Sequence, residues 1–202
     1  SALIESLLCL SRLQINESEK LSEQVDIPAI LPAVKQMLDA KAEKNGMKIV
    51  LKPCAQTGAV YGNAGELTQV FQNLVDNALK YGKAGGTVTV SCRMTDNAAA
   101  PDIKSPAVYA VAVHNTGDPI AADCLPHLFE RFYRVAATKN KAVGTGLGLS
   151  IVQQIVKHHN GAITAESSNE TGTVFTVYLP VRIADGGSET TESPDSADLK
   201  TP

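Results

Sequence analysis

The sequence predicts an α+β fold, a two-layer sandwich in which a mixed, mostly antiparallel sheet packs against three helices. Helical spacing of apolar residues recurs along the chain, strand-like segments alternate with these stretches, and the last two strands read as a hairpin. The chain has 202 residues, of which 44% are hydrophobic and 19% are charged. That is enough for one sizeable core and too little for two large domains.

The chain opens with a predicted helix. Leucine and isoleucine recur at helical spacing between residues 2 and 15, which gives this segment one apolar stripe. The polar stretch 16–24 then interrupts the pattern. Because such a stripe needs a covering surface, we expect this helix to pack on a partner helix.

A second helix is predicted to begin after Asp26 and to end at Asn45-Gly46. Asp26 stands where a capping side chain belongs, and Pro28 suits a first helical turn. Pro32 would interrupt that turn, so a later start is the alternative. Residues 47–52 follow as a strand.

The next helix, from Glu66 to Tyr81, carries two separate faces, and Asn63 has capping-box spacing to Glu66. Its apolar face consists of Leu67, Val70, Phe71, Leu74, Val75 and Ala78. Its polar face consists of Asn73, Asp76, Asn77 and Lys80. Asparagine is disfavoured inside helices because its side chain competes for backbone hydrogen bonds. This polar face therefore predicts a site for a metal ion and a polyanion, although a solvated surface is the simpler alternative.

Two strands and an irregular segment follow. Residues 87–93 and 107–113 are predicted strands, joined by a loop rich in Pro, Asp and Ala. Residues 121–144 are expected to be irregular apart from a helical turn around Phe129.

The last elements are a helix over Ser150–His159 and a hairpin of residues 162–167 and 173–180. Residues 184–202 are rich in Gly, Ser, Thr, Asp and Pro, and we expect a disordered acidic tail there.

A glycine-rich loop precedes the helix that begins at Ser150. Alternating glycines let the backbone approach a ligand closely, and the following helix places the positive end of its dipole behind that ligand. The loop therefore predicts a phosphate-binding site, with a flexible turn or a tight helix-to-strand packing site as the alternatives. Its residues are Gly144, Thr145, Gly146, Leu147, Gly148 and Leu149.

Composition excludes several classes of function. The net charge is −3 and no run of five basic residues occurs, so nucleic-acid binding has no electrostatic support. No apolar run approaches membrane-spanning length, and we expect no membrane contact by this chain. The cysteines lack metal-ligand or redox-pair spacing, which favours reduced thiols used in packing and a cytoplasmic location. They are Cys9, Cys54, Cys92 and Cys124.

Five short segments then follow one another in a characteristic order. They are residues 73–81, 115–120, 128–134, 144–149 and 172–175. They resemble, in this order, the N box, the first glycine box, the F box, the second glycine box and the last Gly-Thr element of the sensor histidine kinases. These kinases belong to the wider family of gyrase, histidine kinase and heat-shock chaperone ATP-binding domains. The resemblance implies a Bergerat-type ATP-binding domain over residues 26–183.

The resemblance assigns roles to individual residues. It implies ATP and Mg²⁺ as cofactors, with Asn77 as the metal ligand and with Arg134 and Lys80 as catalytic residues. Arg134 would reach the γ-phosphate, whose transfer develops charge, and Arg131, Lys139 and Lys141 are weaker candidates for this role. The implied nucleotide-binding set is Asn73, Asn77, Lys80, Tyr81, Asn115, Gly117, Ile120, Arg134, Gly144, Thr145, Gly146, Leu147, Gly148, Leu149 and Thr173.

Asn73 departs from the pattern of the family's ATP hydrolases. Those enzymes carry at this position a Glu that activates water, and a carboxamide cannot take up a proton near neutral pH. Water attack on ATP should therefore be slow, which favours a kinase over an ATPase.

The first glycine box departs from the usual sequence in two places. Asn115 stands where the family usually offers an Asp to adenine, and Pro119 replaces a glycine. A carboxamide can donate as well as accept, so we expect a weaker preference for adenine over guanine.

The phosphate acceptor is missing from the predicted motifs. A kinase's substrate histidine is followed by an acidic residue, and none of His114, His127, His158 and His159 is. Residues 1–25 resemble the end of the second helix of a dimerisation and phosphotransfer domain, followed by a linker. We therefore expect a catalytic fragment that does not phosphorylate itself.

The resemblance implies partners in a parent protein. They are its His-bearing dimerisation domain and, through the parent, a response regulator; whether the parent is membrane-anchored stays open. Two other functions remain as alternatives. One is a protein-serine kinase of the anti-sigma type, which needs no preceding helical pair, and the other is an ATP-binding module without catalysis.

Overall fold

A five-stranded sheet forms one layer of the molecule. The computed structural model describes residues 3–4, 7–8, 11, 21–54, 58–100, 102–136 and 144–181. Its sheet has the strand order β2-β4-β5-β7-β6. The strands are β2 (Lys48–Leu51), β4 (Thr87–Asp96), β5 (Ala107–Asn115), β6 (Ala162–Ser168) and β7 (Gly172–Val181). β2 is parallel to β4 and every other neighbouring pair is antiparallel, which confirms the predicted mixed sheet.

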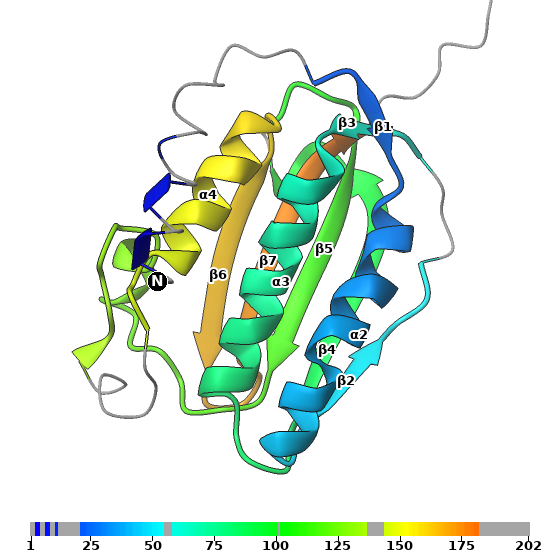
Figure 1. Ribbon diagram of the computed structural model, residues 1–202. Helices are drawn as coiled ribbons and strands as arrows, with labels where there is room; N and C mark the ends of the chain where they lie inside the picture. Colours follow the sequence, from blue (N-terminus) through cyan, green and yellow to red (C-terminus); the bar gives the residue numbers. More distant parts are fainter. Residues whose placement is uncertain are drawn as a thin grey trace, which may run out of the picture.

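Three helices cover one face of this sheet (Figure 1). They are α2 (Ile27–Lys44), α3 (Ala64–Tyr81) and α4 (Gly148–His158), and α3 packs between the other two. Along β4, buried Val88, Val90 and Cys92 alternate with the half-buried residues between them, as expected for a strand with one covered face. The predicted two-layer α+β sandwich is therefore confirmed.

The helix α2 begins at Ile27, directly after Asp26, and not at the later position that Pro32 suggested as the alternative. Asp26 caps it by accepting a hydrogen bond from the backbone N–H of Ala29 at 3.4 Å, and Pro28 lies in its first turn. Pro32 lies inside the helix and costs one backbone hydrogen bond. Burial of neighbouring apolar side chains, including Ile27 and Leu31, offsets this loss.

A small second sheet has no counterpart among the elements predicted from the sequence. β1 (Glu23–Val25) pairs antiparallel with β3 (Val60–Gly62), far along the chain. Each strand has three residues, which is too short for a periodic pattern to be recognised. The pairing brings the start of α2 close to the start of α3.

Several predicted boundaries needed correction. β4 and β5 extend beyond residues 93 and 113, because each continues to pair with its neighbour. The helical turn in the irregular segment lies at Leu125–His127 and not around Phe129. α4 begins at Gly148, two residues before the predicted start.

A histidine clasp joins the beginning of α3 to the end of α4. The Asn63 side chain accepts from the N–H of Glu66 at 3.0 Å, as the predicted capping box requires. The Asn63 N–H, however, donates to Nε2 of His159 at 3.0 Å, and Glu66 instead contacts Nδ1 of His158 at 3.0 Å. His159 Nδ1–H donates to the carbonyl of Ile155 at 2.8 Å, so both of its ring nitrogens are engaged and the ring is neutral.

Gly62 makes this clasp sterically possible. A Cβ atom at position 62 would lie 2.5 Å from the ring of His159. His159 is 1% exposed. His159 is therefore held by hydrogen bonds as a neutral ring, and it carries no charge toward the end of α4.

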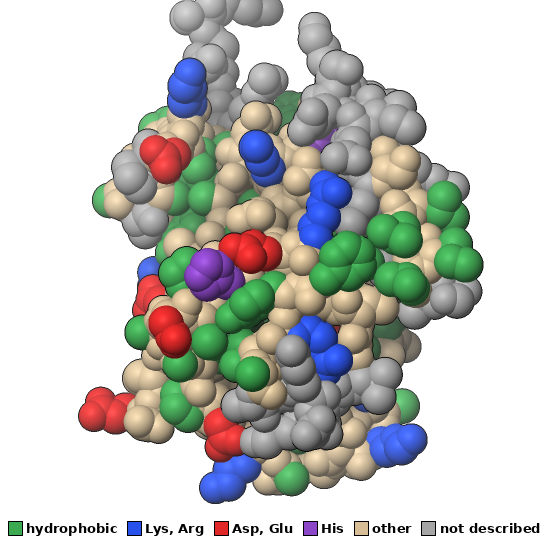
Figure 2. Space-filling view, turned by 90° about the vertical axis from the view of Figure 1, so that its left-hand side faces the viewer, with side chains coloured by type: hydrophobic (Ala, Val, Ile, Leu, Met, Phe, Trp, Pro, Cys, Tyr) green, Lys and Arg blue, Asp and Glu red, His purple; other side chains and the backbone are tan. Residues whose placement is uncertain are grey.

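The apolar side chains that the structure describes in the opening segment are exposed. Its described residues are helical, as predicted, and Leu3, Ile4, Leu7 and Leu8 are 42–57% exposed. Figure 2 shows hydrophobic side chains gathered at one side of the face that it presents. The predicted packing on a partner helix is thus not met within the described part of the chain, and it stays a prediction.

Three of the predicted features can be stated only for part of the chain. Cys54, Cys92 and Cys124 form no disulfide within the described residues, whereas Cys9 lies outside them. The predicted acidic tail, residues 184–202, also lies outside them. No helix in the described ranges is long and apolar enough to cross a membrane.

The His159 clasp makes folding stability depend on pH. Burial lowers the pKa of His159 below its ordinary value of 6.5, although the hydrogen bond to Ile155 and the charge of Glu66 act in the opposite direction. The unfolded chain therefore binds a proton at this histidine more readily than the folded chain does. The contribution of the neutral His159 ring to the free energy of unfolding is fully present above the ordinary pKa and is lost as the pH falls below it. We expect the melting temperature to fall from about pH 7.5 to about pH 5.5 more steeply in the wild type than in His159→Gln.

His127, which is exposed and lies outside the clasp, provides the control: when it is introduced into both proteins, His127→Gln should leave the difference in slope between the wild type and His159→Gln unchanged. Equal slopes for the wild type and His159→Gln would contradict the assignment of a buried neutral imidazole.

Candidate functional site

A cavity of about 590 Å³ opens beside the polar face of α3. Its walls come from α3, the ends of β5 and β7, the loop after β5, the segment around Arg134 and the start of α4. The sequence-predicted residues that line it are Asn73, Asn77, Lys80, Tyr81, Asn115, Ile120, Arg134, Gly144, Thr145, Gly146, Gly148, Leu149 and Thr173. Residues far apart in the sequence are thus brought to one space.

Two predicted residues lie outside this lining. Leu147 is fully buried in the core, where its carbonyl accepts a hydrogen bond from the Ser150 hydroxyl at 2.9 Å. Gly117 forms a β-bridge with Gly82 and thereby ties the loop after β5 to the end of α3. Both residues thus hold segments that line the cavity without lining it themselves.

Asp76 lies between two lysines on the polar face of α3. Its carboxylate pairs with Lys80, one turn further along α3, at 2.6 Å and also with Lys41 of α2. Burial alone would raise the pKa of Asp76, but the hydrogen bonds and charges of Lys41 and Lys80 outweigh it and lower the pKa below its ordinary range. Asp76 is therefore a charged, engaged carboxylate at neutral pH.

Asn73 leaves a buried donor without a partner. Its Nδ2 atom is buried and has no hydrogen-bond partner among the described residues. An unsatisfied buried donor costs free energy, so an acceptor atom that a ligand brings to this donor would stabilise it. Because Asn73 lines the cavity, this donor suits an acceptor oxygen of a bound anion.

Asn115 and Thr173 lie side by side where strands β5 and β7 form one end of the cavity. They are direct neighbours across β5 and β7, and they are 4% and 5% exposed. The Thr173 hydroxyl forms a hydrogen bond of 2.8 Å with the hydroxyl of Ser167, which also accepts from the N–H of Ile120 at 2.9 Å. This chain of bonds fixes the loop after β5 against the sheet.

The glycine loop is joined to the segment that carries Arg134. The N–H of Phe132 donates to the carbonyl of Gly146 at 2.9 Å. Gly146 has a φ of +73°, and a Cβ atom there would lie 2.7 Å from the backbone of Phe132. Phe132 itself has a φ of +64°, an uncommon conformation for a bulky residue.

The cavity also has an apolar and aromatic part that the sequence reading missed. Its residues include Leu128, Tyr133, Val135, Ile151 and Phe175. The pKa of Tyr133 is raised to about 12, mainly by its hydrogen bond to the Cys124 thiol. Apolar side chains on core-facing positions give the same sequence pattern whether they face the core or a ligand, so the sequence offered a signal only through the motif that contains Leu128 and Tyr133 and the motif that contains Phe175.

The weaker candidates do not line the cavity in the described part of the chain. Arg131 is exposed and stands outside the lining. Lys139 and Lys141 lie outside the described residues.

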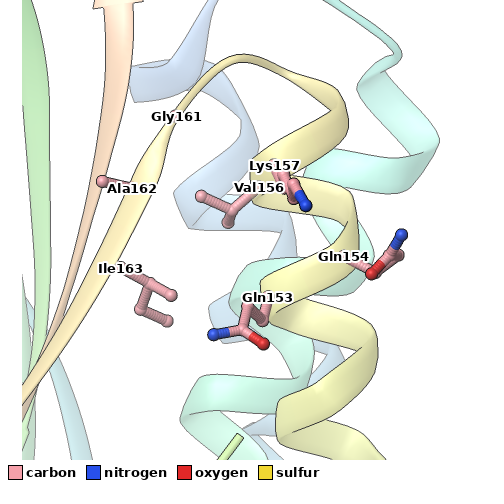
Figure 3. Close-up of a pocket in the computed structure, with 7 residues that line it drawn as sticks. All are labelled: Gln153, Gln154, Val156, Lys157, Gly161, Ala162 and Ile163. Atoms are coloured by element: carbon pink, nitrogen blue, oxygen red, sulfur yellow. The ribbon is translucent and has the colours of Figure 1, made fainter. Parts of the chain in front are cut away.

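A second cavity, of about 340 Å³, lies between α4 and β6 (Figure 3). Val156 and Ile163 face one another across it, whereas Gln154 points outward. Its lining includes one charged side chain, that of Lys157. Polar groups converge at the α3 cavity, which is therefore the better candidate for a functional site.

A family model described as "Histidine kinase-, DNA gyrase B-, and HSP90-like ATPase" matches residues 62–183. Sensor histidine kinase RppB of Synechocystis is 36% identical over 185 residues, which cover 90% of this chain and 38% of that protein. Sensor histidine kinase CusS of Escherichia coli K12 is 32% identical over 179 residues, with 88% of this chain and 35% of that protein covered. The chain thus spans less than two fifths of the length of these relatives.

Two solved structures share the fold. The full-length ShkA structure in complex with AMPPNP aligns with a TM-score of 0.74 at 24% identity, covering 91% of this chain and 36% of that one. The mycobacterial sensor histidine kinase MprB aligns with a TM-score of 0.63 at 25% identity, covering 80% of this chain and 98% of that one.

The contact between Gly146 and Phe132 should depend on the absence of a side chain at position 146. We expect Gly146→Ala to break it, because the new Cβ would collide with the Phe132 backbone and the positive φ would be strained. Hydrogen exchange of the Phe132 amide should then speed up by about tenfold or more.

Gly144→Ala, in the same loop, is the matched control, since a Cβ there meets no atom of the described residues within 4 Å. Unchanged protection of the Phe132 amide in Gly146→Ala would show that the contact does not hold the two segments together.

Proposed function

Because the chain belongs to the histidine kinase-, DNA gyrase B- and HSP90-like ATPase family, we propose that it is the ATP-binding catalytic domain of a two-component sensor histidine kinase. In this proposal it transfers the γ-phosphoryl group of ATP to a histidine on the helical dimerisation domain of its parent protein. The observation that carries the proposal is the convergence of the α3 polar face, the glycine loop and Arg134 on one cavity.

The cavity offers suitable surroundings for each part of ATP. Asn115 can hydrogen-bond a base at the sheet end, where the apolar and aromatic lining can cover its faces. The start of α4, with its preceding glycines, suits phosphate groups because helix N–H groups and the helix dipole favour anions. The buried donor of Asn73 and the ammonium of Lys80 add groups that prefer phosphate oxygens.

Asn77 is the residue that would hold Mg²⁺. It lies on α3 one turn after Asn73, so both carboxamides face the same cavity. A neutral amide oxygen suits a hard cation that already binds phosphate oxygens. When bound, Mg²⁺ would neutralise phosphate charge as the γ-phosphoryl group leaves.

The carboxylates of the cavity support a kinase over an ATP hydrolase. Asn73 occupies the position of the hydrolytic Glu in the resemblance and cannot accept a proton. Asp76 is engaged by two lysines, which lower its pKa and make it a poor general base. Asp118 is the other carboxylate in the described lining of the cavity, and it is exposed on the loop after β5. Water attack on ATP is accordingly disfavoured, and the phosphoryl group is kept for an outside acceptor.

The acceptor and the later partners belong to the parent protein. The proposed acceptor is a histidine on its helical domain, and a response regulator would receive the phosphoryl group from there. The sensor histidine kinases among the relatives support this reading over the serine-kinase alternative.

The metal role of Asn77 can be tested by calorimetry. We expect Asn77→Ala to weaken Mg-ATP binding on the order of tenfold to a hundredfold, because a hard oxygen ligand is lost. ATP binding without magnesium should change much less. Gln72→Ala removes an exposed carboxamide from the same helix, outside the cavity, and should bind as the wild type does. A loss that is the same with and without magnesium would argue against the metal role.

Phosphoryl transfer can be tested with labelled ATP and the separately supplied helical domain of the parent. We expect phosphohistidine to form on that domain, and Arg134→Ala to slow its formation by about a hundredfold or more. Arg131→Ala, which removes an exposed arginine outside the cavity, should have little effect. Tight ATP binding with no phosphohistidine would instead support a binding module without catalysis.

A further inference from the structure

Three charged side chains form a row that runs from α2 into the cavity. Lys41 of α2 pairs with one carboxylate oxygen of Asp76, and Lys80 pairs with the other oxygen at 2.6 Å. Asp76 and Lys80 line the cavity, whereas Lys41 lies behind them and does not. The side chains of Lys41, Asp76 and Lys80 are 39%, 23% and 30% exposed, so solvent screens this row only in part.

We propose that Lys41 is a positioning residue for the polyphosphate of the nucleotide, acting through Asp76 on Lys80. This inference rests on the proposed function, since it concerns how the same cavity receives a nucleotide triphosphate. Lys41 lies outside all of the motifs that the sequence presents, and none of those motifs assigns it a role.

The charge balance of the row gives the first reason. Two ammonium groups and one carboxylate leave one net positive charge beside the cavity. Without Lys41, Lys80 alone would balance the negative charge of Asp76, and its own positive charge would be less available to the phosphates. The charges of Lys41, Asp76 and Lys80 are partly buried and in direct contact, and interactions of this kind are strong enough to alter the binding of an anion beside them.

The sharing of Asp76 gives the second reason. A carboxylate that accepts from two lysines holds each of them less tightly than a carboxylate that accepts from one. Lys41 thereby leaves Lys80 freer to turn one of its donors toward a phosphate oxygen. Loss of Lys41 would leave Lys80 held by Asp76 alone, in the helical i, i+4 pair that α3 forms by itself.

A purely structural role is the competing explanation, because Lys41 and Asp76 also connect α2 to α3. The two explanations differ in their dependence on the ligand. A structural pair would affect adenosine, ADP and ATP alike, whereas an electrostatic role should affect nucleotides in proportion to their phosphate charge.

The experiment measures binding of ATP, ADP and adenosine to the full chain by calorimetry, in the presence of magnesium. We expect Lys41→Met to weaken ATP binding by about three- to tenfold, ADP binding by less, and adenosine binding not at all. Lys41→Arg should restore most of the affinity, since it keeps the charge. In an Asp76→Asn background, Lys41→Met should have an effect of less than about twofold, because the connection through the carboxylate is gone and Lys41, which does not line the cavity, then acts only through a direct charge that solvent screens.

Lys35 provides a matched control on the same helix. It pairs with Asp39 at 2.7 Å and its side chain is 37% exposed, close to that of Lys41, but it does not line the cavity or contact Asp76. Lys35→Met should bind all three ligands as the wild type does. A melting curve for each variant shows that it is folded under the conditions of the titration.

The outcomes separate this inference from the function on which it rests. If the wild type binds ATP but Lys41→Met binds it equally well, or loses affinity for adenosine to the same extent, the inference is overturned and the proposed function stands. The same holds if Lys35→Met weakens ATP binding as much as Lys41→Met does. If the wild type binds no ATP, the proposed function and the inference fail together.

Discussion

The burial of one face of α3 is the constraint on which the rest of the structure depends. α3 packs on the sheet between α2 and α4, and Leu67, Val70, Phe71 and Leu74 are fully buried there. This packing fixes the rotation of the helix, so its opposite face must look into the cavity. Asn73, Asn77 and Lys80 are held in one arc because the apolar face leaves them no other orientation.

Both ends of α3 are held by contacts that the helix does not make alone. At its start, Asn63 joins the helix to His159 at the end of α4, and the pairing of β1 with β3 brings the beginning of α2 alongside. At its end, the bridge between Gly82 and Gly117 ties it to the loop after β5. The helix α3, which forms one wall of the cavity, is therefore connected to α2, to α4 and to the loop after β5. A displacement of one of these elements would also displace the polar face of α3.

The polar groups of the cavity divide into engaged and available ones. Asp76 is held by two lysines, and the hydroxyl of Thr173 is bonded to Ser167. The Nδ2 donor of Asn73, in contrast, is buried without a partner in the described part of the chain. A cavity in which Asp76 is neutralised and the amide donor of Asn73 is available suits an anion, and Asp76 is a poor base for proton abstraction from water. This division between engaged and available groups is the physical basis of our proposal that the cavity serves phosphoryl transfer and not ATP hydrolysis.

The sequence by itself determined the helices, most strands and most of the site. The three-and-four spacing of apolar residues determined α3, and short motifs in a fixed order pointed to thirteen residues that do line the cavity. Such signals are local, because helical periodicity and glycine spacing are set by neighbouring residues. Only the tertiary structure decided that Leu147 is buried, that β1 pairs with β3, that His159 is a neutral clasp and that Lys41 reaches Asp76. Each of these depends on contacts between residues far apart in the chain, and a local pattern carries no information about which distant side chain will be its neighbour.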